Sequence, residues 1–366
     1  MRVLVAMSGG VDSSVAAASL VADGHEVVGA TLKLWGGAQS SGCCSVADVD
    51  DARRVAQQLG IAHHVFNMAD DFDRDVVSPY VAAHAAGRTP NPCIECNRHI
   101  KFDRLLARAR RLGFDRLATG HHAQVREAAG RFFLRRGADA EKDQSYVLSM
   151  LGQAELSSIA LPVGRMTKTE VRAEAARLGL RTADKPDSQD VCFIHDREGR
   201  SGFLSSRVAL HPGVVVDAQS GERLGAVEAV ELVTVGQRRG MPAAGDRRYA
   251  VAVDVRARRV TVARAERAAI DEVLVEPGTV TWVDRALADG QAAVAQLSAH
   301  GRPARCTVHV GAAGSASAAA AAGGLLVRFA SAQRPVAPGQ TLALYDADDP
   351  DEVVGAGIMA GGRRRE

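Results

Sequence analysis

The chain has 366 residues, a formal net charge of +2, 46% hydrophobic and 24% charged residues, and six cysteines. This length is too great for one ordinary domain and predicts two or three units, each with its own core. So few cysteines argue against a disulfide-stapled secreted scaffold, and no apolar run approaches the ~18 residues of a membrane span, so we expect a cytoplasmic protein without a membrane role.

Short β-branched runs alternate with helical stretches over the first 200 residues. The pattern predicts strands over 2–7, 27–32, 63–67 and 116–119, and helices over 13–23, 46–59, 102–112 and 169–178. Such alternation is typical of βαβ units. It predicts an α/β fold with an open, doubly wound parallel sheet.

After about residue 210 the sequence changes to short alternating apolar segments separated by glycine and proline turns. These segments predict strands over 214–216, 248–254, 259–263, 306–310, 325–329 and 341–345. We therefore predict a catalytic domain over 1–205, a small β-rich central domain over 206–270 and a C-terminal β-barrel over 271–366. The stretch 311–324, almost entirely Ala, Gly and Ser, is assigned no function.

Basic residues gather in two segments although the net charge is small. One runs from Arg98 to Arg116 and the other from Arg238 to Arg267. Both could follow the phosphates of a nucleic acid. The alternative is a pair of solvated arginine-rich faces.

A glycine-rich loop, SGGVDSS at 8–14, follows the first predicted strand and begins the first predicted helix. Backbone N–H groups converge at such a junction to bind phosphate. The loop is neither a Walker A motif nor the dinucleotide fingerprint. Asp12 is placed to hold Mg²⁺ there, whereas the alternative is an ordinary turn in which Asp12 or Ser13 caps the helix.

This complete string resembles the PP-loop of the ATP pyrophosphatase family. Its members adenylate a carbonyl oxygen and release pyrophosphate. The family includes enzymes of GMP, asparagine, argininosuccinate and lysidine synthesis, so the resemblance implies the activation chemistry and leaves the nucleophile open.

Two distant cysteines are candidates for that nucleophile. Cys96 lies in a proline-bounded loop, TPNPCIECNR at 89–98, where the start of the basic helix and Arg98 favour a thiolate. Cys192 lies where a polar loop enters an apolar run. Sulfur transfer needs such a pair, because one cysteine carries a persulfide and the other attacks it or closes a disulfide.

Other motif residues have weaker signals. Cys43 and Cys44 are interpreted as loop thiols and Cys306 as a barrel core residue. His121 and His122 follow a predicted strand at its carboxyl end, which is the usual ligand crevice of an open α/β sheet.

Taken in order, SGGVDSS, GRTPNPCIECNRHIKF, ATGHHA, DQSY and DSQDVCFI closely resemble the bacterial tRNA-specific 2-thiouridylases, which make 2-thiouridine at the wobble position. The resemblance covers residues 2 to about 200 and continues more weakly through GQRRG at 236–240 and PGQ at 338–340. It implies ATP-dependent 2-thiolation of the wobble uridine. It also implies two partners, the anticodon arm of tRNA and a sulfur-donor protein such as a cysteine desulfurase or sulfur relay protein.

The resemblance implies roles for individual residues. Cys96 matches the catalytic nucleophile, and Cys192 matches the cysteine that carries the persulfide and closes a transient disulfide with Cys96. The ATP-binding positions are Ala6, Met7, Ser8, Gly9, Gly10, Val11, Asp12, Ser13, Leu32 and Gly120. The positions that face the target base are Asn91, Pro92 and Cys93, and the further tRNA contacts are His121, Asp143, Gln144, Ser145 and Gln340.

Cys93 departs from the family pattern, because many members have an aspartate there. The change creates a Cys-x-x-Cys pair with Cys96, and with Cys192 it offers three thiolates, the number that would hold a [4Fe–4S] cluster with one iron open. A persulfide relay is favoured, since this spacing is permissive and not diagnostic. Zinc is disfavoured because a closed site would occupy the nucleophile.

Two other functions remain open. One is a PP-loop amidotransferase or synthetase that activates a carbonyl for attack by ammonia, which leaves the distant cysteines and basic β-rich modules unexplained. The other is a non-catalytic RNA-binding or iron–sulfur carrier protein, in which ATP turnover is absent and mutation of Asp12 is harmless.

Overall fold

The computed structural model describes residues 1–34, 46–187, 191–194, 199–242, 247–311 and 324–365. Its N-terminal part is built on a five-stranded parallel sheet. The strands, in spatial order, are β3 (Ala62–Asn67), β2 (Glu26–Lys33), β1 (Arg2–Ala6), β4 (Arg116–Thr119) and β7 (Ile159–Ala160). The strand order reverses between β1 and β4, which is where open sheets bind ligands beyond the carboxyl ends of their strands.

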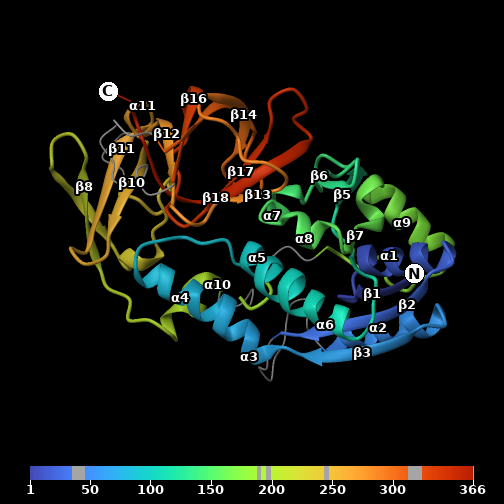
Figure 1. Cartoon of the computed structure of the whole chain (residues 1–366). Helices are drawn as coiled ribbons and strands as arrows, with labels where there is room; N and C mark the ends of the chain where they lie inside the picture. The colour runs from blue at the N-terminus through green and yellow to red at the C-terminus, as the bar shows by residue number, and fades with distance from the viewer. Residues whose placement is uncertain (35–45, 188–190, 195–198, 243–246, 312–323, 366) are drawn as a thin grey trace.

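Both faces of this sheet are covered, which confirms the doubly wound α/β prediction. Val3 and Val5 of β1 face one apolar cluster, whereas Leu4 between them faces another. Figure 1 shows α1 and α9 on one side and the α3 to α6 segment on the other. The helices of this part are α1 (Val11–Ala22), α2 (Val46–Gln58), α3 (Ala69–Phe72), α4 (Ser78–Ala85), α5 (Pro92–Glu95), α6 (Leu106–Arg111), α7 (Ser145–Leu148), α8 (Gln153–Leu156), α9 (Lys168–Arg177) and α10 (Gly199–Ser205).

Helical structure also joins several of these elements. The π-helical segments η1 (Asp73–Val77) and η2 (Cys96–Leu105) connect α3 to α4 and α5 to α6, and η3 (Pro162–Arg165) is a short 3₁₀ turn. The basic helix is therefore longer than the sequence predicted and begins at Pro92. Among the described residues, no helix combines the length and apolar character that crossing a bilayer requires.

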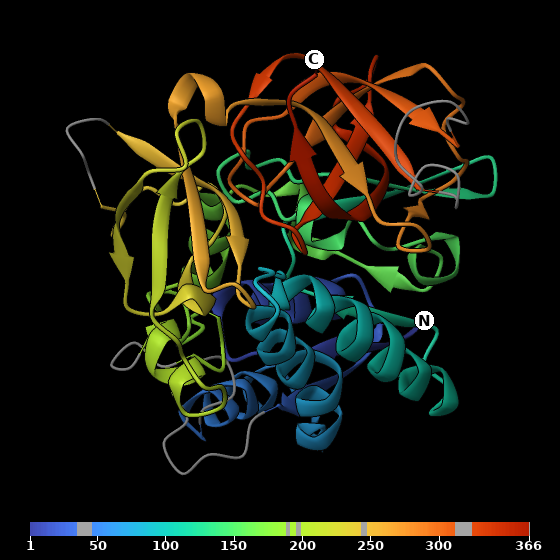
Figure 2. The same cartoon turned by 90° about the vertical axis from the view of Figure 1, so that its left-hand side faces the viewer.

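The middle of the chain forms a separate four-stranded sheet. Its order is β10 (Arg248–Asp254), β11 (Arg259–Arg264), β8 (Gly213–Asp217) and β9 (Arg223–Val227). The turn η4 (Val230–Leu232) and helix α11 (Ala265–Ala268) flank it. In Figure 2 this unit stands beside the C-terminal barrel, and the parallel-sheet unit lies below both.

The C-terminal strands close into the predicted barrel, because β12 pairs with both β16 and β18. Around the ring run β12 (Ile270–Val275), β16 (Leu325–Gln333), β15 (Ala304–Val310), β14 (Gln291–Gln296), β17 (Thr341–Asp346) and β18 (Glu352–Arg363), with β13 (Thr281–Trp282) paired to β18. Glu272 of β12, whose side chain is 4% exposed, bridges Arg328 of β16 and Arg363 of β18 at 2.8 Å each. This ion triad ties the closing strands together.

The barrel sheet continues into the N-terminal part of the chain. The hairpin β5 (Ala123–Ala128) and β6 (Arg131–Arg136) lies between catalytic-unit elements in sequence, yet β6 pairs with β18. A second junction lies where the Thr89 amide donates to the carbonyl of Pro338 at 2.8 Å and Arg88 pairs with Glu276. Both junctions join the barrel to the parallel-sheet unit.

Candidate active site

The SGGVDSS loop connects β1 to α1 and closes on itself. Gly9 has φ +74°, and a Cβ there would lie 2.2 Å from the carbonyl oxygen of Asp48, so the position requires glycine. The hydroxyls of Ser13 and Ser14 donate to the carbonyl of Gly10 at 3.2 and 2.8 Å. The N-cap residue is Gly10, and no side chain of the described residues caps α1. The first N–H groups of this helix therefore face a site suited to phosphate.

Asp12 anchors a network of charged groups at this loop. Its two carboxylate oxygens each lie 2.8 Å from Lys168 Nζ, and Oδ1 lies 3.1 Å from His122 Nε2. Partial burial raises the pKa of Asp12, but the hydrogen bonds and charges of His122 and Lys168 outweigh it and leave the pKa below its ordinary value. Asp12 is therefore ionised at neutral pH, and one carboxylate beside the phosphates of a nucleotide is the usual arrangement for Mg²⁺.

Lys168 links this loop to the segment that precedes Cys192. Its Nζ lies 2.8 Å from Asp187 Oδ1, and Lys142 and Arg172 contact the same carboxylate at 2.9 Å each. Burial raises the pKa of Asp187, but the hydrogen bonds and charges of Lys168 and Lys142 bring it down to about 2. Asp187 is therefore an anion at neutral pH, within a cluster of three cations.

A second lysine fixes the other end of the loop. Lys185 Nζ donates to the carbonyl of Gly9 at 3.0 Å and lies 2.6 Å from Asp48 and 2.8 Å from Asp51. The sequence did not single out Lys168 or Lys185. The available signals were the capping sequence TKTE at 167–170, which starts α9, and the basic residue just before DSQDVCFI.

The residues predicted to surround adenosine lie at the carboxyl ends of β1, β2 and β4. Met7 and Leu32 are buried, and Thr31 Oγ1 donates to the carbonyl of Met7 at 2.7 Å. Gly120 ends β4 so close to the loop that a Cβ there would lie 2.6 Å from the amide nitrogen of Ser13. The predicted ATP positions therefore share one edge of the sheet.

His121 and His122 leave β4 in different environments. His121 is buried, Thr119 Oγ1 lies 2.7 Å from its Nδ1, and Lys101 Nζ lies 3.5 Å from its Nε2. Burial and then the charges of Lys101 and His122 hold the pKa of His121 well below its ordinary value. His122 turns to Asp12, and its buried Nδ1 has no hydrogen-bond partner in the described structure, which leaves it available to a ligand.

Cys93 and Cys96 lie on the first turns of the long helix and not in a loop. The Asn91 side chain accepts from the Cys93 amide at 3.0 Å and caps the helix, and Pro92 occupies its first position. Cys93 is exposed, whereas Cys96 is buried at the start of the π-helical stretch. Wide turns of this kind are frequent at functional sites.

Cys192 packs against the same apolar cluster that contains Cys96. The following residue, Phe193, is 1% exposed and contacts Phe72, Tyr80 and Phe203 edge-on or tilted. Residues 192–194 form a turn and not the strand-like run that their apolar pattern suggested. The aromatic contacts of Phe193 fix the position of the chain next to Cys192.

Outside the long helix and the Cys192 segment, the described residues include neither a metal-binding group nor a further reactive cysteine. Among the described residues, no group of three or more His, Cys, Asp or Glu side chains is arranged to hold a metal ion. Cys306 lies in the barrel, and burial raises the pKa of its thiol to about 12. Cys43 and Cys44 lie outside the described residues.

The predicted tRNA contacts near residue 144 are held by internal hydrogen bonds. Asp143 accepts from Arg136, from the Gly137 amide and from Ser145, and Ser145 Oγ lies 3.1 Å from Tyr345 OH in the barrel. Ser145 is fully buried. Ser145 thus links the catalytic unit to the barrel, and Asp143 holds Arg136, whose guanidinium lies 3.8 Å above the Tyr345 ring.

Gln144 and Gln340, which were also predicted to contact tRNA, form hydrogen bonds with the backbone of two loops. Gln144 Oε1 accepts from the His122 amide at 2.9 Å. Gln340 Nε2 donates to the carbonyl of Thr89 at 2.8 Å, and Thr89 lies two residues before Asn91. Gln340 thus connects the barrel to the loop that precedes the cysteine helix.

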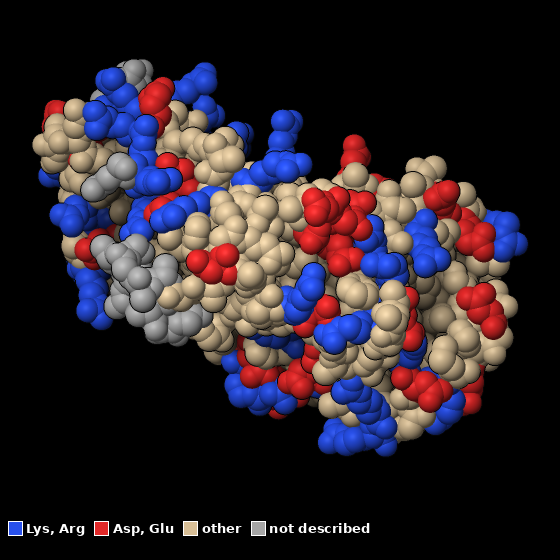
Figure 3. All heavy atoms as spheres, turned by 45° about the horizontal axis from the view of Figure 1, so that its top comes forward, with Lys and Arg blue, Asp and Glu red and all other residues tan. Residues whose placement is uncertain are grey.

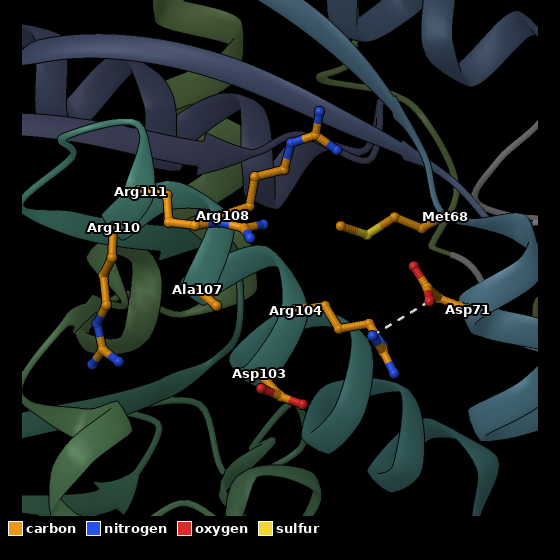
Figure 4. A pocket seen from close by; sticks show the side chains of 8 residues that line it. All are labelled: Met68, Asp71, Asp103, Arg104, Ala107, Arg108, Arg110 and Arg111. Carbon is orange, nitrogen blue, oxygen red and sulfur yellow. Dashed lines mark ion pairs between the residues drawn. The ribbon is translucent and has the colours of Figure 1, made fainter.

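The basic residues of the long helix are largely engaged within the protein. A hollow between this helix and α3 is shown in Figure 4, and it is lined by Met68, Asp71, Asp103, Arg104, Ala107, Arg108, Arg110 and Arg111. Arg104 pairs with Asp71 and Asp75, and Arg108 lies 4.1 Å above the Phe66 ring. No described cysteine is among the residues that line this hollow.

The second basic segment forms an exposed face on the central sheet. Figure 3 shows Lys and Arg gathered at that end of the molecule. Arg248 is partly buried and pairs with Asp217, whereas the exposed members are Arg238, Arg239, Arg247, Arg256, Arg258, Arg259, Arg264 and Arg267. This face, and not the helix of the first segment, carries the larger exposed charge.

Comparison with family models gives three adjacent matches. They are described as the tRNA methyl transferase HUP domain, the tRNA methyl transferase PRC-barrel domain and the aminomethyltransferase beta-barrel domain. The matched residues are 1–196, 201–264 and 296–359. Together they span the parallel-sheet unit, the central sheet and much of the barrel.

Curated relatives match along nearly their whole length. The tRNA-specific 2-thiouridylase MnmA of Rhodococcus jostii (strain RHA1) is 44% identical, over 99% of this chain and 98% of its own. That of Mycobacterium bovis (strain BCG / Pasteur 1173P2) is 45% identical, over 99% and 97%. A solved 4-thiouridine synthetase–RNA complex with bound ATP is 18% identical, over 52% of this chain and 44% of that chain, with a TM-score of 0.36.

Proposed function

Because the chain belongs to the tRNA-specific 2-thiouridylase family, we propose that it catalyses ATP-dependent 2-thiolation of the wobble uridine of tRNA. The products are 2-thiouridine, AMP and pyrophosphate, and the enzyme is a sulfurtransferase of the cytoplasm. The observation that carries the proposal is the shared sheet edge, where the SGGVDSS loop, Gly120 and His122 meet. The cysteine helix joins the same unit.

In the proposed first half-reaction, the SGGVDSS loop binds ATP and the uridine O2 attacks its α-phosphate. The base must leave the anticodon stack to present O2. Asp12 would hold Mg²⁺ together with the nucleotide phosphates, and the ion would neutralise phosphate charge. Lys168 and the N–H groups of α1 bind the leaving pyrophosphate, since they surround Asp12.

In the second half-reaction, sulfur reaches Cys192 as a persulfide from a donor protein. Its terminal sulfur bonds to C2 of the adenylated uridine, and the C2–oxygen bond to AMP breaks. The Cys96 thiolate then attacks Cys192 Sγ, which forms the Cys96–Cys192 disulfide and leaves the sulfur on the base. An external thiol reduces the disulfide for the next cycle.

An iron–sulfur alternative uses the three cysteines as ligands. Cys93, Cys96 and Cys192 do not converge as a metal-binding group in the described structure, so we derive no step through a [4Fe–4S] cluster. Iron and sulfide analysis after anaerobic reconstitution tests that alternative. Bound cluster that is lost in Cys93→Ser would favour it over the persulfide relay.

The tRNA contacts are proposed for two surfaces. Asn91, Pro92 and Cys93 start the cysteine helix and would face the target base, with Gln340 holding the loop beside them. The arginine face of the central sheet would follow phosphates of the anticodon arm, with binding that weakens as salt rises.

The test is mass spectrometry of nucleosides from unmodified tRNA incubated with the protein, MgATP and a persulfide donor. We expect ATP-dependent 2-thiouridine from the wild type and from Cys306→Ala, and none from Cys96→Ser or Cys192→Ser. Pyrophosphate release that requires ammonia and no tRNA would favour the amidotransferase alternative. A wild type without ATP turnover would favour the RNA-binding alternative.

A further inference from the structure

The hollow between the long helix and α3 combines one buried apolar residue with charged walls (Figure 4). Met68 is the buried residue, and the charges come from Asp71, Asp103 and four arginines. Arg104 reaches across from the long helix to Asp71 of α3. The hollow encloses about 470 Å³, a volume that can receive several side chains of a partner.

Two arginines of this hollow have no acceptor within the described part of the chain. The guanidinium of Arg108 lies 4.1 Å above the Phe66 ring, and this stacking leaves its N–H groups free to donate. Arg111 is exposed. Arg104 and Arg110, by contrast, are held by neighbouring oxygens of the protein. Arg108 and Arg111 are therefore the groups that can bind anions from outside.

The α3 wall of the hollow also contacts the segment that carries Cys192. Asp71 lines the hollow, and the next residue, Phe72, meets the Phe193 ring edge-on with centroids 5.7 Å apart. Phe193 directly follows Cys192, and Cys192 packs on the same apolar cluster as Met68. A protein seated in the hollow is therefore separated only by α3 from the cysteine that receives sulfur.

The mixed charges of the hollow favour a protein segment over RNA. A polynucleotide carries a negative phosphate at every step, which Asp71 and Asp103 repel. A protein can place single carboxylates against Arg108 and Arg111 and keep other groups opposite the two aspartates. The base-facing end of the long helix lies elsewhere, since Cys93 and Arg108 are about 20 Å apart along it. A donor in the hollow therefore leaves that end open to the tRNA.

We propose that this hollow is the docking site of the sulfur-donor protein, whose carboxylates contact Arg108 and Arg111 while its persulfide faces Cys192. The inference rests on the proposed function. In the transfer, the Cys192 thiolate attacks the terminal sulfur of the donor's persulfide, the S–S bond of the donor breaks, and the donor cysteine leaves as a thiolate. No oxidant is needed. Docking holds the two sulfurs together, so Cys192 is loaded at low donor concentrations.

The experiment measures 2-thiouridine formation by the full chain with tRNA and MgATP, using either a cysteine desulfurase with its cysteine substrate or glutathione persulfide as sulfur source. We expect the double variant Arg108→Glu, Arg111→Glu to need about tenfold more desulfurase for half-maximal rate, because two attractive contacts become repulsive. Its rate with glutathione persulfide and its KM for tRNA should equal those of the wild type.

Arg177→Glu is the matched control. It makes the same charge change at an exposed position of α9, on the other side of the parallel sheet (Figure 1), and should behave as the wild type does. Thermal unfolding shows whether each variant is folded. If the double variant is not, Arg111→Glu alone, at an exposed side chain, should raise the desulfurase requirement about threefold.

The two sulfur sources separate the possible failures. An unchanged desulfurase requirement in the folded variants overturns the docking site, and a raised KM for tRNA with both sources assigns the hollow to RNA instead. Wild type that gains nothing from the desulfurase over glutathione persulfide also overturns the docking site and leaves the proposed function standing. Wild type that makes no 2-thiouridine from either source overturns both proposals.

Discussion

Gly120→Ala tests whether the close approach of β4 to the ATP loop matters for catalysis. A Cβ at this position would lie 2.6 Å from the Ser13 amide nitrogen, 2.7 Å from the Asp12 carbonyl carbon and 3.0 Å from Asp12 Cβ. All three belong to the backbone or its first side-chain atom, so no flexible side chain can turn away. Either the end of β4 or the start of α1 must move.

The size of the movement follows from ordinary contact distances. Carbon and nitrogen atoms pack about 3.5 to 4.0 Å apart, so the loop and strand must separate by about 1 Å. Overpacking of this kind destabilises a protein by about 1 to 3 kcal/mol. A displacement of about 1 Å in a group that positions substrate lowers the rate about 100-fold. We therefore expect kcat/KM for ATP to fall about 100-fold in an enzyme that still folds.

Pyrophosphate release at varied ATP concentrations, with saturating tRNA, measures the first effect, and thermal unfolding measures the second. Gly152→Ala is a matched control, because a Cβ there would lie 3.5 Å from its nearest neighbour, an ordinary contact. A Gly120→Ala enzyme with kcat/KM for ATP within twofold of wild type would refute the reasoning. The strand end would then not position the loop.

Three other predictions concern the barrel and the charge network. Gln340→Ala removes the hydrogen bond to the Thr89 carbonyl, which is worth about 1 kcal/mol. In steady-state thiolation assays it should raise KM for tRNA about fivefold without changing KM for ATP. A KM for tRNA equal to that of the wild type would contradict this prediction. The pKa of Asp187 falls from 3.8 to about 2 on folding, so its contribution to stability is complete above pH 4 and is lost as the pH falls through 2. Acid unfolding monitored by circular dichroism should show this loss in the wild type and not in Asp187→Asn. Glu272→Gln leaves two arginines without their carboxylate and should lower the free energy of unfolding, measured by thermal unfolding, by about 3 kcal/mol. A loss below ~1 kcal/mol would argue against a role for the ion triad in closing the barrel.

The parts of the fold that could be predicted from the sequence are those that local sequence patterns specify. The βαβ rhythm predicts the parallel sheet, and the glycine loop after β1 lies at the expected carboxyl edge. Periodicity sets which residues share a face, as Val3 and Leu4 illustrate by facing opposite clusters. The cysteine helix was predicted to start too late, because prolines suggested a loop where Asn91 and Pro92 in fact begin a helix.

The contacts that sequence reasoning missed join residues far apart in the chain. Lys168 and Asp12 are separated by 156 positions, and their pairing depends on how α9 packs against α1. Asp143 and Ser145 match tRNA-contacting positions, yet their hydrogen bonds run to the barrel hairpin and to Tyr345. Neither composition nor spacing specifies such a partner.

The pairing of β6 with β18 has a consequence for synthesis of the protein. Arg135 and Glu352 face each other across this ladder and lie 217 residues apart. While the chain grows from the ribosome, the β5–β6 hairpin therefore presents an unpaired strand edge until β18, more than 200 residues further along the chain, emerges. Late pairing of this kind slows folding. We expect the nascent chain to need protection at that edge, and the barrel to register correctly only when its final strand is complete.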